Sequence, residues 1–424
     1  MSGPVIGFAG MTHLGLLSAA AAADRGFRVI AYDPALAAAL EGGELPIVEP
    51  DLPALMARGR GRMLFTAQLS ELSRCDVVYV AVDVPTDEHG RSDLAPIHAM
   101  VDHVAGAQNP ESTLVVLSQV PPGFTRALPV PTERLYYQVE TLVFGRAVER
   151  ATRPERFIVG CADPSSPLPA PWADFLAAFS CPILPMRYES AELAKISINV
   201  CLVASLSVAN QLAELCESIG ADWAEIAPAL RLDRRIGAHA YLNPGLGIAG
   251  GNLERDLQTT ISLAQTQRLG AGLVQAFLDH SARRKQWTFT VLAEVLLSRN
   301  PRAKIAVLGL AYKENTHSTK NSPALALLDR LRGCAVSVHD PVVSATVVPW
   351  ALGAVDAMDA VAGADALVVA TPWPHYRALK PAALKRAMAG RLILDPYRVL
   401  DGRACAAAGF TYYALGMAPL TAAT

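Results

Sequence analysis

The chain begins with a short apolar run, a long alanine- and leucine-rich run and a second short apolar run. These are PVIGFAG (4–10), LGLLSAAAAADRG (14–26) and RVIAYDP (28–34). The short β-branched runs predict strands and the middle run predicts a helix, which together make a βαβ unit with short turns. Similar runs at 76–85, 112–123 and 156–160 continue the alternation. The pattern predicts a parallel sheet covered by helices on both faces.

The same alternation restarts at AKIAVLGLAYK (303–313) and continues through VSVHDP, ALVVATPWP and RLILDP. Between the two halves, residues 189–223 hold few helix breakers and predict a helix of about 30 residues, about 45 Å long. A second helical region is expected at about 253–298. We therefore expect an α/β protein with two Rossmann-like, doubly wound parallel-sheet domains, joined by a long central helix and a helical middle domain. The predicted boundaries are 1–188, 189–300 and 301–424.

The composition and the residue spacing argue against several classes of partner. Charged residues make up 18% of the chain, the net charge is −2 and no basic stripe is present, so nucleic acid is not an expected partner. Seven scattered cysteines without a CxxC pair indicate a reduced, cytoplasmic protein. The apolar run LGLLSAAAAA is shorter than the about 20 residues that a membrane span needs, so no membrane is expected. No group of ligand residues at metal-binding spacing is visible, so no metal is expected.

A dinucleotide-like signature follows the first strand. GMTHLG (10–15) is GxTxxG, in which Gly10 would make the tight turn and Gly15 would let helix and strand approach. Thr12 takes the place of the glycine that normally lets backbone touch the pyrophosphate. Asp33 ends the next strand, where a carboxylate binds ribose hydroxyls and its charge disfavours the 2′-phosphate of NADP. The context predicts NAD as the cofactor.

Five motifs are spread along nearly the whole chain. SQVPPG (118–123) resembles STVPPG, VETLVFGRA (139–147) resembles PEFLREGxA, and AELAKISIN (191–199) resembles the ELxKxxxN helix. Residues 233–256 follow DxRIGxxYLxPGxGFGGSCFPKD, and residues 308–325 follow LGLAFKxNTDDxRxSPAL. Together these motifs resemble those of the UDP-glucose/GDP-mannose dehydrogenase family. The resemblance implies an NAD-binding domain, a central helical domain that pairs two chains, and a C-terminal UDP-binding domain. Its members oxidise the C6 alcohol of a nucleotide sugar to a carboxylate with two NAD⁺, through a thiohemiacetal on a cysteine, which suggests a role in polysaccharide biosynthesis.

The resemblance assigns roles to individual residues. Lys195 and Asn199, which share one helix face, and Asp256 match the residues that handle the alcohol proton and the alkoxide. Glu140 matches the glutamate of the later, water-dependent steps. The expected cofactor-binding residues are Gly10, Thr12, His13, Leu14, Gly15, Asp33, Val84, Pro85, Ser118 and Gln119. The expected substrate-binding residues are Arg235, which would cross the interface of a homodimer, Tyr241, Asn243, Gly247, Gly250, Lys313 and Lys320.

The alignment places Asn252 where the family has its nucleophilic cysteine, and none of the seven cysteines lies in that loop. An amide has no ionisable nucleophile, so the thiohemiacetal route is closed. Other departures gather around the second oxidation: Gln119 replaces a threonine near the catalytic water, and Val139 and Phe144 alter PEFLRE. Lys195, Asn199 and Asp256 persist.

Three functions fit this pattern. The first is an NAD-dependent oxidoreductase that transfers one hydride from a UDP-hexose and releases an aldehyde or a ketone. The second is a full four-electron dehydrogenase, in which the hydrated aldehyde gives up the second hydride without a thiol. The third is a non-catalytic protein that binds NAD and a UDP-sugar. The sequence does not identify the sugar.

Overall fold

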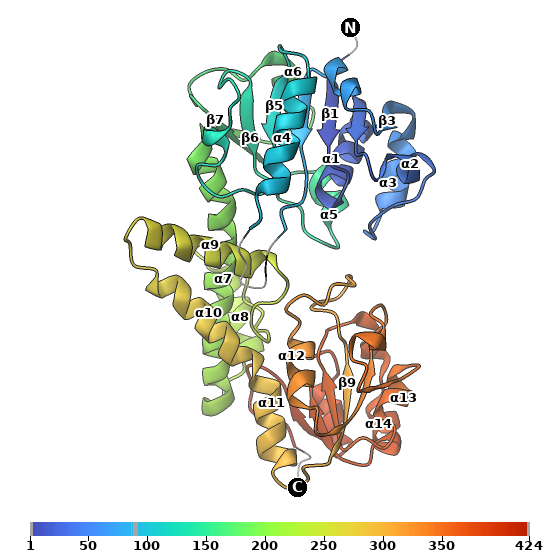
Figure 1. The fold of residues 1–424 in the computed structure, drawn as a ribbon. Coiled ribbons are helices and arrows are strands. Elements are labelled where there is room, and N and C mark those ends of the chain that lie inside the picture. The colour runs from blue at the N-terminus through green and yellow to red at the C-terminus, as the bar shows by residue number, and fades with distance from the viewer. Residues whose placement is uncertain (1–2, 86, 88–91, 422–424) are drawn as a thin grey trace. The chain divides into compact units, whose positions relative to one another are not determined.

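The computed structural model describes residues 3–85, 87 and 92–421. They form two compact units, residues 1–198 and residues 199–424, each built around its own sheet. Figure 1 shows the first unit in blue to green and the second in green to red. The confirmed fold class is thus α/β with two Rossmann-like sheets and a long central helix, whereas the three-part domain division stays a prediction.

The first unit contains an eight-stranded sheet. In spatial order its strands are β3 (Met63–Thr66), β2 (Arg28–Tyr32), β1 (Val5–Ala9), β4 (Val77–Val80), β5 (Thr113–Val116), β6 (Leu135–Gln138), β7 (Phe157–Cys161) and β8 (Ile183–Arg187). Its helices are α1 (His13–Asp24), α2 (Ala37–Glu41), α3 (Leu52–Gly59), α4 (Ala95–Ala107), α5 (Ala147–Thr152) and α6 (Ala170–Ala177), with single 3₁₀ turns at Arg60–Arg62, Leu69–Arg74 and Thr125–Ala127.

The sheet is buried on both faces, as the continuous apolar runs predicted. Alternate strand residues belong to two separate clusters: Phe8 packs with α1, α3 and α6, whereas Ala9 packs with α4. All neighbouring strands are parallel except β6 and β7, which are antiparallel. The expectation of a purely parallel sheet is therefore corrected at this pair. The reversal matters for the site, because the β6–β7 connection carries Glu140.

The second unit contains a six-stranded, fully parallel sheet and four preceding helices. Its strands are β11 (Leu352–Gly353), β10 (Ala335–His339), β9 (Lys304–Leu308), β12 (Ala366–Val369), β13 (Leu392–Leu394) and β14 (Thr411–Tyr413) in spatial order. The preceding helices are α8 (Trp223–Leu232), α9 (Asn252–Thr266), α10 (Gly272–Lys285) and α11 (Trp287–Leu292), which continues as a π turn, Ala293–Leu297. The sheet's own helices are α12 (Pro323–Arg330), α13 (Ala357–Val361), α14 (Pro381–Ala387) and α15 (Gly402–Ala407), with 3₁₀ turns Ala345–Val347 and Pro374–Ala378.

The two sheets repeat one turn in detail. Gly10 and Gly309 follow the first strand of each sheet, both with φ of +100°, a left-handed conformation that favours glycine. In each turn the next main-chain N–H donates to the carboxylate that follows the second strand of the sheet. Met11 N donates to Asp33 over 2.8 Å, and Leu310 N donates to Asp340 over 2.7 Å. The restart that the sequence pattern predicted at residue 303 is therefore a repeat of local geometry.

The central helix α7 (Tyr188–Ile219) is 32 residues long and runs from the first unit into the second. It ends at Ile219, four residues before the end of the predicted run 189–223. Gly220 adopts φ of +77°, which stops the helix, and the Asp222 side chain then caps α8 by accepting from Ala224 N over 2.9 Å. Local chemistry therefore sets the end of α7 despite the apolar and alanine-rich residues that follow.

Candidate active site

The turn after β1 is built around its two glycines. A Cβ on Gly15 would lie 1.8 Å from Gly10 O, and a Cβ on Gly10 would lie 2.9 Å from Val82 Cγ1. Both positions therefore exclude a side chain, which is what the fingerprint reading requires. Gly10 N donates to Tyr32 O over 2.9 Å, so the turn is held against β2.

Two polar groups at this turn fit a dinucleotide. Thr12 is the residue before α1, and its hydroxyl is buried without a hydrogen-bond partner among the residues that the structure describes. A buried unpaired hydroxyl is costly, and a phosphate oxygen at the helix N-terminus would satisfy it. Asp33 accepts from the N–H groups of Met11, Ala35 and Leu36, which fixes a carboxylate at the end of β2. The negative charge of Asp33 would repel the 2′-phosphate that NADP carries on its adenosine ribose, so this position favours NAD.

His13 is the first residue of α1, and its contacts are local. Its Nε2 lies 3.4 Å from Glu49 Oε2, and its ring centroid is 4.1 Å from that of Phe144. The Glu49 side chain is almost fully buried, and its other oxygen accepts from Ala147 N over 2.9 Å. Glu49 therefore ties the expected phosphate turn to the N-terminus of α5. No contact of His13 with phosphate follows from this arrangement, and that role stays a prediction.

The other expected cofactor residues lie on the same unit. Ser118 is fully buried and donates to Val82 O over 2.5 Å, which ties the loop after β5 to the loop after β4. Gln119 follows it and is half-buried, as is Val84, whereas Pro85 is exposed. Leu14 is buried and packs in the core beneath the turn. Ser118 thus has a structural contact that its predicted role did not include.

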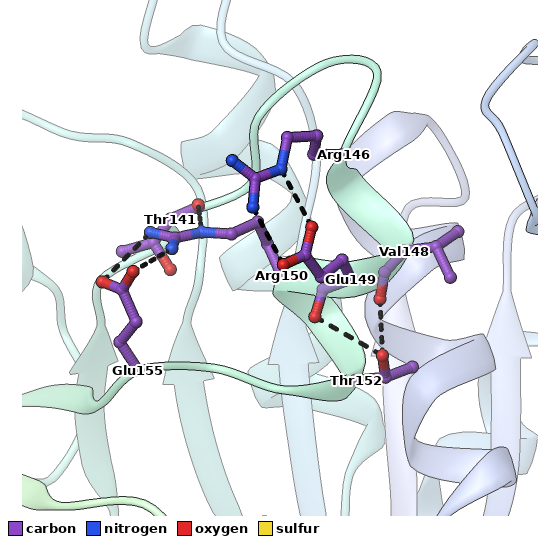
Figure 2. Close-up of polar contacts among 7 residues, drawn as sticks. All are labelled: Thr141, Arg146, Val148, Glu149, Arg150, Thr152 and Glu155. Carbon is purple, nitrogen blue, oxygen red and sulfur yellow. Dashed lines mark hydrogen bonds and ion pairs between the residues drawn. The ribbon is translucent and has the colours of Figure 1, made fainter. Parts of the chain in front are cut away.

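Lys195 and Glu140 come together in the first unit. Lys195 Nζ on α7 lies 3.3 Å from Glu140 Oε2 in the β6–β7 connection, and both side chains are largely buried. The other Glu140 oxygen accepts from Leu142 N. Figure 2 shows how the chain just beyond Glu140 is held, with Arg150 Nε donating to Thr141 O over 3.4 Å and its guanidinium pairing with Glu155. The amine and the carboxylate are therefore held by both helix and loop.

The other half of the predicted machinery lies in the second unit. Asn199, one helical turn after Lys195 on α7, donates from its amide to Asp256 Oδ2 over 2.5 Å. Asp256 is fully buried and Asn199 is 9% exposed. Asn252 is exposed and begins α9, one turn before Asp256. The structure thus brings Asn199 and Asp256 into contact and places Asn252 at a helix N-terminus, where main-chain N–H groups lack helical partners.

The glycine-rich loop 245–251 is clamped before it enters α9. Ile248 N donates to Ser281 Oγ over 2.7 Å, and a Cβ on Gly247 would lie 2.5 Å from Ser281 O. Gly250 N donates to Lys320 O over 3.1 Å, and a Cβ on Gly250 would lie 3.1 Å from the Tyr312 ring. The glycines therefore allow the loop to lie against α10 and against the segment after β9.

Domain models of one known protein family match most of the chain. The NAD-binding, central and UDP-binding domain models of the UDP-glucose/GDP-mannose dehydrogenase family match residues 5–168, 189–282 and 306–402. The UDP-glucose 6-dehydrogenase of Pseudomonas aeruginosa is 31% identical over 438 residues, covering 96% of each chain.

This chain belongs to that family. A solved UDP-glucose dehydrogenase from Pyrobaculum islandicum is 26% identical, with a TM-score of 0.82 over 95% of this chain and 98% of that one. A solved UDP-D-ManNAc dehydrogenase from Pyrococcus horikoshii shares the fold, with a TM-score of 0.84 at 23% identity over 97% and 99% of the two chains. The protein is thus an NAD-dependent oxidoreductase of the nucleotide-sugar dehydrogenase type, as predicted.

The residues expected to meet the nucleotide sugar are spread over the second unit of this dehydrogenase. Lys313 Nζ lies 5.7 Å from the centroid of the Tyr312 ring, and Tyr241 is half exposed. Asn243 accepts from Arg231 over 2.7 Å. Arg235 is 89% exposed and pairs with Asp233 two residues earlier, which leaves its predicted role across a dimer interface untested.

Two residues near the site were not singled out by the sequence. Glu49 supports His13 and α5, and Glu192 on α7 accepts from two main-chain N–H groups of the loop after β5. Glu192 is the glutamate of AELAKISIN, so a signal for it was present in the motif. Its partners are main-chain groups, which a sequence pattern does not identify.

Proposed function

We propose that this dehydrogenase oxidises a UDP-hexose by a single hydride transfer and releases an aldehyde, or a ketone if another carbon is presented. The observation that carries the proposal is Asn252 at the start of α9, one turn before the buried Asp256. The motif resemblance puts the family's cysteine at this position. Without a thiolate, the carbonyl product has no covalent bond that would hold it for a second oxidation.

The residues support removal of one proton and one hydride. The carbinol C–H bond breaks and its electron pair leaves as hydride, which NAD⁺ accepts when bound; the hydroxyl proton leaves to a base. Asp256, held by Asn199, is the carboxylate that orders the accepting water. The Lys195 side chain stabilises the developing alkoxide, and its pairing with Glu140 orients it.

A second candidate is supported by Glu140, the glutamate expected to serve the water-dependent steps. It persists and contacts Lys195. If the aldehyde adds water, the resulting diol has a C–H bond and a hydroxyl again, and a second NAD⁺ can accept its hydride. The Asn252 amide and the N–H groups that begin α9 would then bind the diol oxygens, and the product would be a uronate.

Nucleotide-sugar turnover distinguishes these candidates. A panel of UDP-glucose, UDP-N-acetylhexosamines and GDP-mannose is incubated with NAD⁺, following absorbance at the NADH band and product mass. The proposal predicts one NADH per sugar consumed and a product two mass units lighter than the sugar nucleotide. Two NADH per sugar and a uronate support the second candidate. Binding of NADH and UDP without turnover of any sugar indicates a non-catalytic protein.

We also propose a cytoplasmic homodimer that pairs through α7. The second half of α7 exposes an apolar stripe at helical spacing: Val208, Leu212, Leu215 and Ile219. By length and composition alone α7 could also cross a membrane. We favour a second copy because polar residues of α7 bond within both units, Glu192 to Gly123 and Asn210 to Gly245. Light scattering of the purified protein tests this, with Leu212→Asp expected to give monomers.

A further inference from the structure

Glu192 is a fully buried carboxylate on the first turns of α7, three residues before Lys195. Its Oε2 accepts from Gly123 N over 2.6 Å and its Oε1 accepts from Thr125 N over 2.8 Å. Among the described residues, Glu192 has no ion pair with a lysine, arginine or histidine. A buried charge without a cation is expensive, so these two N–H groups provide most of its stabilisation.

The N–H groups that Glu192 binds belong to the loop after β5. Gly123 adopts φ of +95°, and Thr125 starts the short 3₁₀ turn Thr125–Ala127. The other end of this loop is held by the hydroxyl of Ser118, which donates to Val82 O over 2.5 Å. Gln119 lies between the two anchors. The six residues 118–123 therefore form a short bridge that is fixed to the cofactor side by Ser118 and to α7 by Glu192.

The other carboxylate on this face of α7 makes a different kind of contact. Glu189 pairs with Arg126, and both side chains are more than 40% exposed. Exposed ion pairs contribute little, about 0–1 kcal/mol. Glu189 therefore holds the same loop weakly through a side chain, whereas Glu192 holds its main chain from inside the core. Glu189 therefore provides a matched control for Glu192 on the same helix.

The charge state of Glu192 follows from this environment. Burial raises the pKa of Glu192, and hydrogen bonds from Thr125 and Gly123 lower it only in part. Protonation of one Glu192 oxygen would put an O–H donor opposite the N–H group that this oxygen accepts from, while the other oxygen could still accept. Two nearby charged groups also act on Glu192: Glu189 raises the same pKa, and the Arg126 guanidinium interacts electrostatically with the Glu192 carboxylate. Both hydrogen bonds together therefore require the ionised form, and one of them is lost as pH falls through the raised pKa.

We propose that Glu192 is a positioning residue for hydride transfer, which holds the 118–125 loop on α7 so that Gln119 and Lys195 keep fixed places relative to each other. The proposal rests on the function proposed above, because it assumes that Lys195 acts on the alcohol. A loop displaced by about 1 Å can cost about 100-fold in rate without loss of binding. Glu192 acts through the loop and the helix and does not contact substrate.

The test compares Glu192→Gln, Glu192→Asp and the control Glu189→Gln in the full chain. The amide of Glu192→Gln can accept only one of the two N–H groups, and the shorter carboxylate of Glu192→Asp keeps the charge but cannot reach both. We expect kcat to fall at least 10-fold in both variants, while the NADH dissociation constant, measured by fluorescence, changes less than threefold. Glu189→Gln should keep wild-type kcat.

Amide hydrogen exchange provides a readout that does not depend on turnover. Exchange in residues 118–127 should accelerate in both Glu192 variants relative to Glu189→Gln, with the sheet strands unchanged. If Glu192→Asp keeps kcat within twofold, or if exchange in 118–127 is unaltered, the proposal is wrong. If the wild-type protein turns over no sugar, the proposed function fails, and the exchange data still decide whether Glu192 fixes the loop.

Discussion

Asn199 on α7 and Asp256 on α9 are joined by a 2.5 Å hydrogen bond inside the second unit, although 57 residues separate them in the chain. Both side chains are buried, so the amide N–H satisfies a carboxylate oxygen that would otherwise be costly. The pair sets Asp256 one turn beyond Asn252 on α9. This arrangement supports a carboxylate that is held ready to order a proton-accepting water.

Replacing Asp256 by Asn should abolish most turnover. The substitution keeps the shape but removes the charge that a water-ordering base needs, so kcat should fall about 100-fold or more while UDP binding is retained. Steady-state NADH formation and UDP calorimetry measure the two effects. Asp279→Asn on the exposed side of α10 is the control. Wild-type kcat in Asp256→Asn would show that this carboxylate has no part in proton removal.

Lys195 and Glu140 should behave as a coupled pair. Lys195→Met removes the cation, and we expect kcat to fall by about two orders of magnitude, with NADH affinity within threefold of wild type. Glu140→Gln alone should cost less. Because the groups are 3.3 Å apart, the double variant should be less impaired than the product of the single effects. Strictly multiplicative effects on kcat would contradict a shared role.

The first half of the fold was predictable because its signals are local. A βαβ pattern, Gly10, Gly15 and Asp33 fixed the turn after β1, and the structure reproduces it with main-chain hydrogen bonds. The antiparallel β6–β7 pair was not predictable, since strand direction depends on how the connecting segment packs. The end of α7 depends on the left-handed Gly220, a single local choice within an otherwise helix-compatible run.

Cofactor choice should respond to Asp33. In Asp33→Asn the main-chain N–H groups of Met11, Ala35 and Leu36 keep an oxygen acceptor, but the negative charge at the end of β2 is lost. We expect the KM for NAD⁺ to rise about 10-fold and the preference for NAD⁺ over NADP⁺ to narrow. The ratio of kcat/KM for the two cofactors measures this. An unchanged ratio would mean that Asp33 does not bind the adenosine ribose hydroxyls of the cofactor.

Asp340, the counterpart of Asp33, should make the second unit sensitive to acid. Burial alone would raise the pKa of Asp340. Hydrogen bonds from the main-chain N–H groups of Leu310, Val343, Ala311 and Val342 lower it by more than burial raises it, so the pKa lies below its ordinary value of 3.8. A lowered folded-state pKa adds stability above the unfolded-state pKa, and this stability is lost as pH falls through the folded-state value.

Asp340→Asn should therefore destabilise the second unit by about 1–3 kcal/mol at pH 7, with a smaller difference below about pH 4. Trp373 donates to Asp340 over 3.0 Å, so its fluorescence, one of five tryptophan signals in the chain, is sensitive to this position during urea unfolding. Asp329→Asn on the surface of α12 is the control. A destabilisation that stays constant from pH 7 to pH 3 would contradict the linkage.

The site was predicted less completely than the fold, for a physical reason. The motif resemblance assigned roles to Lys195, Asn199 and Asp256, because each is a side chain with its own chemistry, and these roles stay predictions. Glu192 and Glu49 act by accepting main-chain N–H groups, and Ser118 acts by donating to a main-chain oxygen. Almost every residue carries these main-chain groups, so the sequence does not show which of them a side chain will contact. The contacts can be identified only in the folded chain.

The number of NADH molecules formed per sugar nucleotide consumed tests the central claim most directly. With the protein as it stands we expect a ratio of one and a carbonyl product, and we expect Asn252→Cys to move the ratio towards two by restoring a thiolate. The ratio is obtained from NADH absorbance and from mass spectrometry of the same reaction. A ratio of two with a uronate from the unaltered protein would contradict the single-transfer account.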